Sequence, residues 1–465
     1  MIIERYAPVN LLELIPRLRL EMEPELAKLD CLLEDDKLFE QVKEALSRRY
    51  TKSLTHGRHS TPVEVILRML VIKRLYNWSY EQLEHFVSDS LVLRQFCRVY
   101  AEAVPDDTTL IRWANLIGPK TLDKLNRRAV ELARSLKVTR GRKLRVDSTV
   151  VETNIHHPTD SGIIGDGVRV LSRLLRRAKT VVGEASGLAK GVFRTRTGSV
   201  RRLAQQMHRT ARRKGEEGVD QMKQAYTKLV EIAGKSRDQA AKVCEALRER
   251  EEKGARRLVK QFERYLPLVD QAISQAVRRV IYGEVVPAKE KVLSLFEPHS
   301  QIIVRHKAGK PTEFGRGLWL GEVEGGIISH HTILPQAGQD QPYLAETLTA
   351  HKQQFGKAPQ LLAGDRGVFS QANEELAKKE GVKRVAIPYS GKAPPERVKH
   401  ERQPWFRRAY RFRAGIEGRI NVLKRCFALD RCLNHGEDGF EAWVGWGILT
   451  SNLNKIAETQ VARQT

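Results

Sequence analysis

The chain has 465 residues, with 81 Lys and Arg against 56 Asp and Glu, and a formal net charge of +25. Its hydrophobic fraction of 41% excludes global disorder. No apolar run approaches the roughly 18 residues of a membrane span, and the start has no signal-peptide pattern. Five scattered cysteines indicate a reducing compartment rather than a disulfide scaffold. The basic excess predicts a polyanionic partner, most often nucleic acid, with a merely solvated basic surface as the alternative.

Residues 1–137 predict a domain of short helices. Thr61-Pro62-Val63-Glu64 is a helix start with Thr61 as the N-cap, and Ser79-Tyr80-Glu81-Gln82 is a capping box. Asp106 and Asp107 are expected to cap a further helix rather than to bind a metal. Short helices with tight turns suit helix-turn-helix DNA binding, although any small helical domain has a similar pattern.

The pattern changes after residue 142, where residues 143–151 alternate as a strand. Residues 161–297 then predict helices almost throughout, contain no Trp and carry a net charge of +14. Strand patterns resume beyond them, at residues 301–305, 318–323, 327–334, 360–364 and 385–387. We therefore expect an α/β or α+β catalytic domain, residues 138–160 and 298–465, interrupted after its first strand by a helical insertion, residues 161–297.

The charge excess is concentrated inside this insertion. Residues 168–214 hold fourteen Lys or Arg and one acid, Glu184, and apolar residues recur among them at helical spacing. Charges of a single sign favour phosphate contact over a face that touches only solvent, and each such contact adds salt-sensitive affinity. The expected DNA-binding residues of this segment are Arg173, Arg176, Arg177, Arg201, Arg202, Arg212 and Arg213.

Three acids are candidates for metal chemistry. Asp147 lies in the first predicted strand, Asp365 follows a later strand, and Glu417 lies on a late basic helix. Singly, Asp147 could be a turn acid and Asp365 a loop cap. Together, two carboxylates from strands and a third from a helix can converge on Mg²⁺ or Mn²⁺, which prefer oxygen ligands. Two such ions can activate an attacking oxygen and stabilise a leaving one.

The helix that carries Glu417 has a distinctive face. Tyr410, Arg413, Glu417 and Lys424 are offset by 0, 3, 7 and 14 residues, which places them within roughly 60° of one another. The acid could then hold metal while the two bases hold flanking phosphates. The alternative is a surface ladder of charges beside a core tyrosine.

The spacing Tyr-(2)-Arg-(3)-Glu-(6)-Lys resembles the signature of bacterial insertion-sequence transposases of the DDE class. Asp147 in Arg-Val-Asp-Ser-Thr and Asp365 in Gly-Asp-Arg-Gly resemble the first and second acids of that family, and Glu417 the third. Residues 57–62 and 105–113 resemble its N-terminal helical domain. The resemblance covers most of residues 55–155 and 300–450, and the long insertion resembles the ISNCY subgroup.

The resemblance implies an RNase H-like catalytic domain that binds two Mg²⁺ or Mn²⁺ ions through Asp147, Asp365 and Glu417. It implies cleavage at the terminal inverted repeats of a transposon, joining of the freed 3′-OH to target DNA, and a homodimer on DNA in the bacterial cytoplasm, associated with the nucleoid. Some relatives carry a Trp that stacks on an extruded base, in an insertion between the second acid and the Glu. Here that interval is 52 residues, and the Trp-free insertion lies between the two aspartates instead.

Two further functions stay open from the sequence. One is a non-catalytic DNA-binding protein descended from a transposase, and the other is a metal nuclease that cuts without strand transfer. The pairs His156-His157 and His330-His331 lack partners at zinc-site spacing, so structural or surface roles are expected for them. Trp443 and Trp446 are expected to pack the last helix on the sheet.

Overall fold

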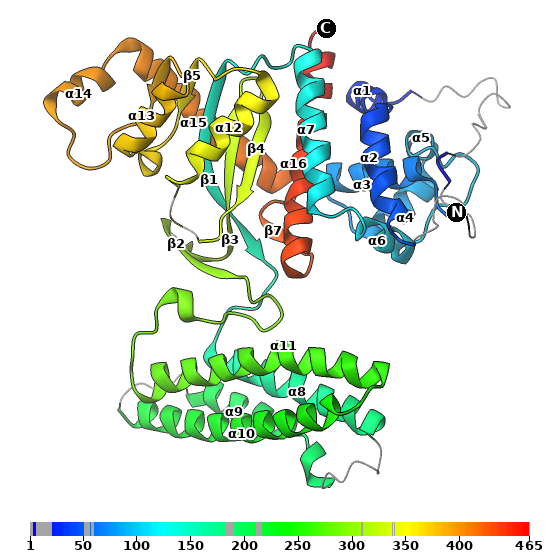
Figure 1. Ribbon diagram of the computed structural model, residues 1–465, viewed down its shortest axis with the longest axis vertical. Helices are drawn as coiled ribbons and strands as arrows, with labels where there is room; N and C mark the ends of the chain where they lie inside the picture. Colours follow the sequence, from blue (N-terminus) through cyan, green and yellow to red (C-terminus); the bar gives the residue numbers. More distant parts are fainter. Residues whose placement is uncertain are drawn as a thin grey trace. The chain divides into compact units, whose positions relative to one another are not determined.

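The computed structural model describes residues 3–5, 21–50, 56, 60–182, 190–210, 216–307, 310–336, 338 and 340–464 (Figure 1). The chain forms two compact units. We call residues 1–153 with 303–465 the sheet unit, and residues 154–302 the bundle unit. Within the described ranges, no helix is long and apolar enough to cross a membrane.

The sheet unit is built on a mixed sheet. The strand order is β2-β3-β1-β5-β6, with β4 paired to β3 and β7 paired to β1. β3 runs antiparallel to β1 and β4, whereas β5 and β7 run parallel to β1. The strands are β1 (Lys143–Thr153), β2 (Gln301–Lys307), β3 (Lys310–Val323), β4 (Ile327–Ile333), β5 (Leu361–Ala363), β6 (Arg384–Ala386) and β7 (Arg431–Cys432).

This sheet confirms the expected mixed α/β architecture and the predicted strands. β7, a two-residue strand, was not predicted from the sequence, because it is too short to show alternation. The RNase H-like character of the fold stays a prediction.

Helices cover both faces of the sheet. Successive side chains of a strand point to opposite faces, and on one face Val146 belongs to the same apolar cluster as Leu344 and Leu348 of α12 (Tyr343–Phe355). On the other face, Ala363 and Ala386 pack with Phe406 and Ala409 of α15 (Pro404–Cys426). The smaller helices of this region are α13 (Gln371–Lys379) and α14 (Pro395–Glu401).

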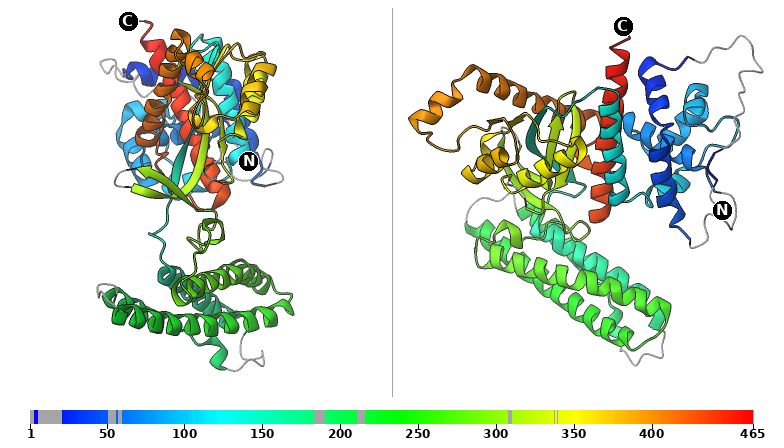
Figure 2. Two further views of the ribbon diagram at one scale, coloured as in Figure 1. Left: turned by 90° about the vertical axis from the view of Figure 1, so that its left-hand side faces the viewer. Right: turned by 45° about the horizontal axis from the view of Figure 1, so that its top comes forward.

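The N-terminal helices pack on the last helix, α16 (Gly436–Val461), which is largely buried along its length. α16 contacts α7, α1 and α3, and it runs beside α7 in Figures 1 and 2. One apolar cluster continues from the N-terminal helices into the sheet. These helices are α1 (Pro24–Leu32), α2 (Asp36–Ser47), α3 (Val63–Leu75), α4 (Tyr80–Asp89), α5 (Leu91–Phe96), α6 (Asp107–Ala114) and α7 (Pro119–Ser135).

Two of the predicted helix starts are confirmed and one is wrong. Ser79 and Gln82 form the complete capping box of α4, and Asp106 accepts a hydrogen bond from the Thr109 amide. α3, however, begins at Val63 with Pro62 at the N-cap and no side-chain cap, so Thr61 lies outside it. The physical reason is that the Val63 and Glu64 amides at the start of α3 donate to the backbone oxygens of Ile3 and Glu4, so they need no side-chain cap. Glu64 is buried and pairs with Arg68.

The bundle unit is helical, as predicted for residues 161–297. Its long helices share one apolar core, to which α8 contributes Val168, Leu171, Leu174 and Leu175. A short 3₁₀ turn, Lys190–Phe193, precedes α9, and a π-helical turn, Val277–Ile281, follows α11. The helices are α8 (Asp160–Val182), α9 (Thr197–Thr210), α10 (Glu216–Arg248) and α11 (Lys253–Ala276).

Candidate active site

The first candidate acid, Asp147, lies in the middle of β1 and is buried. It shares a face of the strand with Arg145, two residues earlier. The Arg145 guanidinium donates a hydrogen bond to the backbone oxygen of Phe412 on α15. Asp147 therefore points to the face of the sheet that α15 covers.

The second acid, Asp365, lies just beyond the end of β5. Because β5 is parallel to β1 with Arg145 beside Ala363, the register continued by two residues brings Asp365 beside Asp147. Asp365 also caps the 3₁₀ turn Arg366–Val368, where its Oδ1 accepts the Val368 amide at 3.2 Å. It is thus a loop cap as well as a neighbour of the first acid.

Arg413 of α15 joins all three candidate acids. Its Nη2 lies 2.8 Å from Asp147 Oδ2 and 3.9 Å from Asp365 Oδ2, while its Nη1 lies 2.7 Å from Glu417 Oε1. The Arg413 side chain is 12% exposed, whereas that of Glu417 is 66% exposed. The guanidinium therefore sits among the carboxylates, with Glu417 at the solvent side.

A fourth acid, Asp340, was missed by sequence reasoning. It precedes α12, and its Oδ2 accepts a hydrogen bond from the Ser148 hydroxyl at 2.9 Å. A Cβ added to Gly367 would meet Asp365 Oδ1 at 3.3 Å and Asp340 Oδ2 at 3.8 Å, so this turn has little room for a side chain. Asp340 lies in a loop without periodicity, and no motif in the sequence marks it.

The electrostatics of this cluster are those of crowded carboxylates. Burial raises the pKa of the Asp147 carboxyl to about 6, against the lowering effect of Arg413. The neighbouring charges of Asp365 and Asp340 raise the pKa further, whereas the Ser148 amide lowers it. Like charges gathered in a partly buried site favour a cation among them, and Arg413 supplies one.

Tyr410 and Lys424 lie on the same helix, farther from the acids. Tyr410 is exposed, and it precedes Arg413 by about one turn. Lys424 is half-buried and lies two turns beyond Glu417, on the order of 10 Å along the helix axis. The structure brings Arg413 into contact with the acids and leaves Tyr410 at the surface of α15.

The donor set fits a hard divalent cation in its chemistry. Carboxylate oxygens suit Mg²⁺, which is often held by one or two carboxylates together with substrate phosphates and water. Asp147 and Asp365 supply such oxygens side by side. In the described part of the chain, no three or more His, Cys, Asp or Glu side chains are gathered as a ready-made metal site. Glu417 is instead bonded to Arg413.

The candidate DNA-binding arginines of the bundle unit lie on two neighbouring helices. Arg173, Arg176 and Arg177 are exposed on α8, and Arg201 and Arg202 are exposed on α9. None of these five forms an ion pair with any residue that the structure describes. Arg212 and Arg213 lie outside the described residues.

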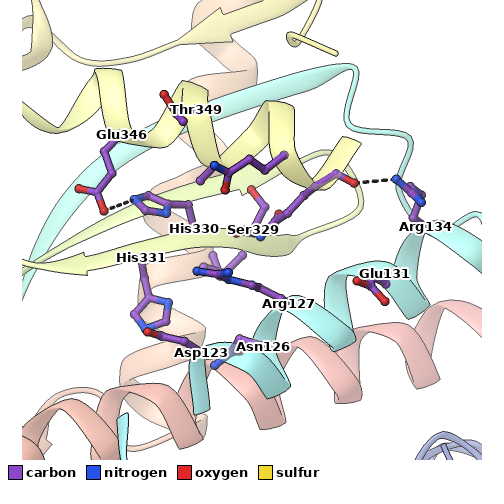
Figure 3. Close-up of a pocket in the computed structure, with 14 residues that line it drawn as sticks. Asp123, Asn126, Arg127, Glu131, Arg134, Ser329, His330, His331, Glu346 and Thr349 are labelled. Atoms are coloured by element: carbon purple, nitrogen blue, oxygen red, sulfur yellow. Dashed lines mark hydrogen bonds and ion pairs between the residues drawn. The ribbon is translucent and has the colours of Figure 1, made fainter. Parts of the chain in front are cut away.

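The His330-His331 pair lines a separate cavity of about 570 Å³ between α7, β4 and α12 (Figure 3). His330 Nε2 lies 3.8 Å from Glu346 Oε1, and His331 Nε2 lies 3.8 Å from Asp123 Oδ1. Burial lowers the pKa of each imidazole to about 4, so both are neutral at physiological pH.

Comparison with known proteins supports a transposase family. Residues 15–116 match the model of a family described as a transposase domain (DUF772). That stretch covers N-terminal helices and none of the four acids. A curated relative, "Uncharacterized protein ORF8 in nfe locus" from Rhizobium meliloti, is 29% identical over 129 residues, which are 26% of this chain and 61% of that protein. The chain thus spans about three fifths of that relative. No solved structure matches.

Proposed function

We propose that this protein is a DDE-type transposase that cuts DNA at transposon ends and joins the freed 3′-OH to target DNA. The observation that carries the proposal is the contact of one guanidinium, that of Arg413, with Asp147, Asp365 and Glu417. These acids are 218 and 52 residues apart in the chain. A surface ladder of charges on α15 would not require the two aspartates of the sheet to meet that helix.

The transposase-domain match supports the same class of function independently, because it involves residues 15–116 and not the acids. The mixed sheet, with Asp147 inside a central strand and Asp365 at the end of its parallel neighbour, is compatible with an RNase H-like catalytic domain. The signature spacing on α15 agrees with the DDE class, and the long helical insertion with the ISNCY subgroup.

Asp147 and Asp365 would hold Mg²⁺ or Mn²⁺ in the active complex, and Glu417 would join them once Arg413 turns to a phosphate. Two such ions, when bound, supply activation of the attacking oxygen and stabilisation of the leaving oxygen. The chain's own contribution is positioning. Arg413 forks onto two phosphate oxygens, and Lys424 acts as a point charge on a neighbouring phosphate. Tyr410, exposed on the same helix, would contact the DNA beside them.

In the overall reaction, water breaks the phosphodiester at the transposon end and releases a 3′-OH and a 5′-phosphate. The 3′-OH then attacks a phosphodiester of the target, where a second 3′-oxygen leaves. The partners would be the terminal inverted repeats and target DNA, bound by a homodimer. A cytoplasmic, nucleoid-associated location belongs to this proposal.

The test is single-turnover cleavage of a duplex that carries the inverted repeat flanking the gene, with Mg²⁺, beside binding of the same duplex. We expect Asp147→Ala, Asp365→Ala and Glu417→Ala each to abolish cleavage and to leave binding largely intact. Asp220→Ala, at an exposed acid of α10 without an ion pair among the described residues, is the control and should cut normally.

The two other candidate functions have distinct outcomes in this assay. Binding without cleavage by the unmodified protein, across metals and ends, would favour the non-catalytic DNA-binding protein. Cleavage without any joined product would favour the metal nuclease.

A further inference from the structure

A second cavity of the sheet unit, about 330 Å³, lies where α3 and α4 meet the start of α7 and the start of α16. Its size is within the range of roughly 300–1,000 Å³ typical of small-molecule sites. We call it the α3–α16 pocket and define it by Lys73, Arg74, Tyr80, Trp443 and Trp446, which line it together with smaller residues. It shares no residue with the four-acid cluster.

Two adjacent cations line this pocket without an acidic partner. Arg74 is 7% exposed, and its Nη2 donates to the Trp443 backbone oxygen at 3.1 Å. No carboxylate of the described chain lies within 4 Å of Lys73 or Arg74. Burial, followed by repulsion from Arg74, lowers the pKa of the Lys73 ammonium to about 8. Arg74 is buried and Lys73 is half-buried, and charges out of water are normally paired, so this pair of cations is costly to the fold.

The same helix provides an internal comparison. Arg68, less than two turns earlier on α3, is fully buried and is paired with both Asp30 and Glu64. The N-terminal helices therefore do neutralise a buried arginine where its role is structural. At Arg74 and Lys73 they do not, which indicates that the neutralising group comes from outside the chain.

The backbone around the pocket adds to the positive potential. α7 and α16 both begin there, and neither helix has a side-chain hydrogen bond capping its N-terminus. The dipole of a helix makes its N-terminus favourable for anions. At α7 this dipole acts largely without free amides, because Pro119 has no N–H and the Thr121 and Leu122 amides donate to the Gly118 oxygen. Asp438, in the first turn of α16, is the one carboxylate among the residues that line the pocket, and it is exposed.

The walls of the pocket are aromatic. Lys73 Nζ lies 4.4 Å from the ring centre of Tyr80, and the Arg74 guanidinium lies 3.9 Å from that of Trp443. Trp446 lines the pocket from the same helix as Trp443. Aromatic rings interleaved with cations are the usual surface on which nucleobases stack next to their phosphates.

We propose that the α3–α16 pocket binds one phosphorylated nucleoside, with its phosphate on Lys73 and Arg74 at the two helix N-termini and its base against the aromatic walls. The nucleoside phosphate could be part of a DNA strand or a free mononucleotide, and both have this chemistry. The proposal is independent of catalysis, because it uses neither the acids nor a metal.

The experiment titrates the full-length protein with dAMP, with inorganic phosphate and with a short 5′-phosphorylated single-stranded oligonucleotide, in EDTA. Quenching of tryptophan fluorescence is the readout, since Trp443 and Trp446 line the pocket, and calorimetry checks it. We expect saturable binding that Lys73→Met weakens about ten- to a hundredfold, the loss of one charged hydrogen bond. Lys379→Met, at an exposed lysine of α13, should change nothing.

The thermal midpoint, Tm, serves as the control that each variant is folded. Because Lys73 is an unpaired cation, Lys73→Met should keep or raise Tm, so a weaker binder that is equally stable reports on the pocket. Tyr80→Leu should weaken dAMP more than inorganic phosphate, since it removes only an aromatic wall.

Binding of dAMP identifies a site that accepts free nucleotides, and binding of the oligonucleotide alone identifies a nucleotide within a strand. Either result supports the proposal if Lys73→Met weakens it. The proposal is overturned if neither dAMP nor the oligonucleotide binds, or if Lys73→Met leaves their binding unchanged. Equal affinity for dAMP and inorganic phosphate overturns the role of the aromatic walls. None of these outcomes bears on cleavage, so failure here is distinguishable from failure of the proposed transposase activity.

Discussion

Arg413 is the residue around which the candidate active site is organised. Its two terminal nitrogens contact acids from β1, from the end of β5 and from its own helix. From the sequence, the arginine and Lys424 were expected to flank Glu417 and to hold phosphates. The structure places the guanidinium among the acids, where its positive charge offsets part of their negative charge. The contact with phosphates stays a prediction.

Replacing Arg413 by Lys tests whether this guanidinium acts on the transition state. The substitution keeps the charge and loses the bidentate fork. We expect single-turnover cleavage with Mg²⁺ to fall about 10²–10³-fold, the usual effect of removing a preorganised donor, with binding much less affected. Arg411→Lys, at an exposed arginine of the same helix, is the matched control. Equal losses in cleavage and binding would indicate a docking surface instead.

Asp340 allows a second test at the residue scale. Its charge raises the pKa of Asp147, so the two carboxylates repel each other in the metal-free protein. Asp340→Asn keeps an oxygen that can accept from Ser148 and removes this repulsion. We expect Tm in EDTA to rise by roughly 1–2 °C for each kcal/mol gained, given the size of the sheet unit. Cleavage should decline, because a negative charge next to the proposed metal ligands is lost. A lower Tm would show that Asp340 is mainly structural.

At the scale of elements, the sequence predicts those features that depend on neighbouring residues of the chain. The alternation around Asp147 identified β1, the Ser79–Gln82 box identified α4, and helical spacing placed Arg413 next to Glu417. The failures come from tertiary contacts. Thr61 is not a cap because the first amides of α3 donate to the backbone oxygens of Ile3 and Glu4. Asp340 reaches the site through a loop whose position depends on the packing of α12.

The α3–α16 pocket also lay beyond prediction from the sequence. Trp443 and Trp446 were assigned to packing alone, and both do belong to apolar clusters. That two cations from α3 meet them depends on how α16 packs against α3, which no periodicity specifies.

The two histidines of β4 lead us to expect that the stability of the fold decreases at acidic pH. His330 and His331 have pKa values near 4 in the fold, below the ordinary value of 6.5. Between about pH 6.5 and pH 4, these two histidines are therefore protonated in the unfolded chain but neutral in the folded chain. The free energy of unfolding should not depend on these histidines above about pH 6.5. It should fall as the pH drops toward 4, by about 1.4 kcal/mol per pH unit for each histidine.

This expectation is checked by measuring Tm from about pH 7.5 to about pH 4.5, which covers most of the window in which the histidines titrate. His331→Gln should flatten the decline, because Gln has no proton to gain. His208→Gln, at an exposed histidine of α9, is the control. If both variants follow the unmodified protein, the acid sensitivity arises elsewhere.

At the scale of the whole molecule, the net charge of +25 is divided unequally. Residues 161–297 carry +14 of it and fold as a bundle around their own apolar core, without any acid of the candidate active site. The exposed residues Arg173, Arg176 and Arg177 of α8 and Arg201 and Arg202 of α9 form no ion pairs among the described residues. Within the proposed function, we propose that the sheet unit carries out the chemistry and that the bundle unit supplies sequence-independent affinity for DNA.

The salt dependence of DNA binding tests this division. Each phosphate contact contributes about 0.9 to the slope of log affinity against log salt, because binding releases counterions. Changing Arg173, Arg176 and Arg177 together to Gln should therefore flatten the slope by about 2–3 for duplex DNA. The measurement is binding of an end-containing duplex across a series of salt concentrations, with unchanged Tm as the check on folding.

The matched control changes three exposed bases of α11, Arg256, Arg257 and Lys260, to Gln in the same unit. Both triple variants remove the same net charge, so they alter the long-range field of the protein equally. A flatter slope for the α8 variant alone would assign phosphate contact to that helix, because counterion release requires close approach. Equal slopes for both variants and the unmodified protein would mean that the basic face of α8 is solvated and makes no phosphate contact.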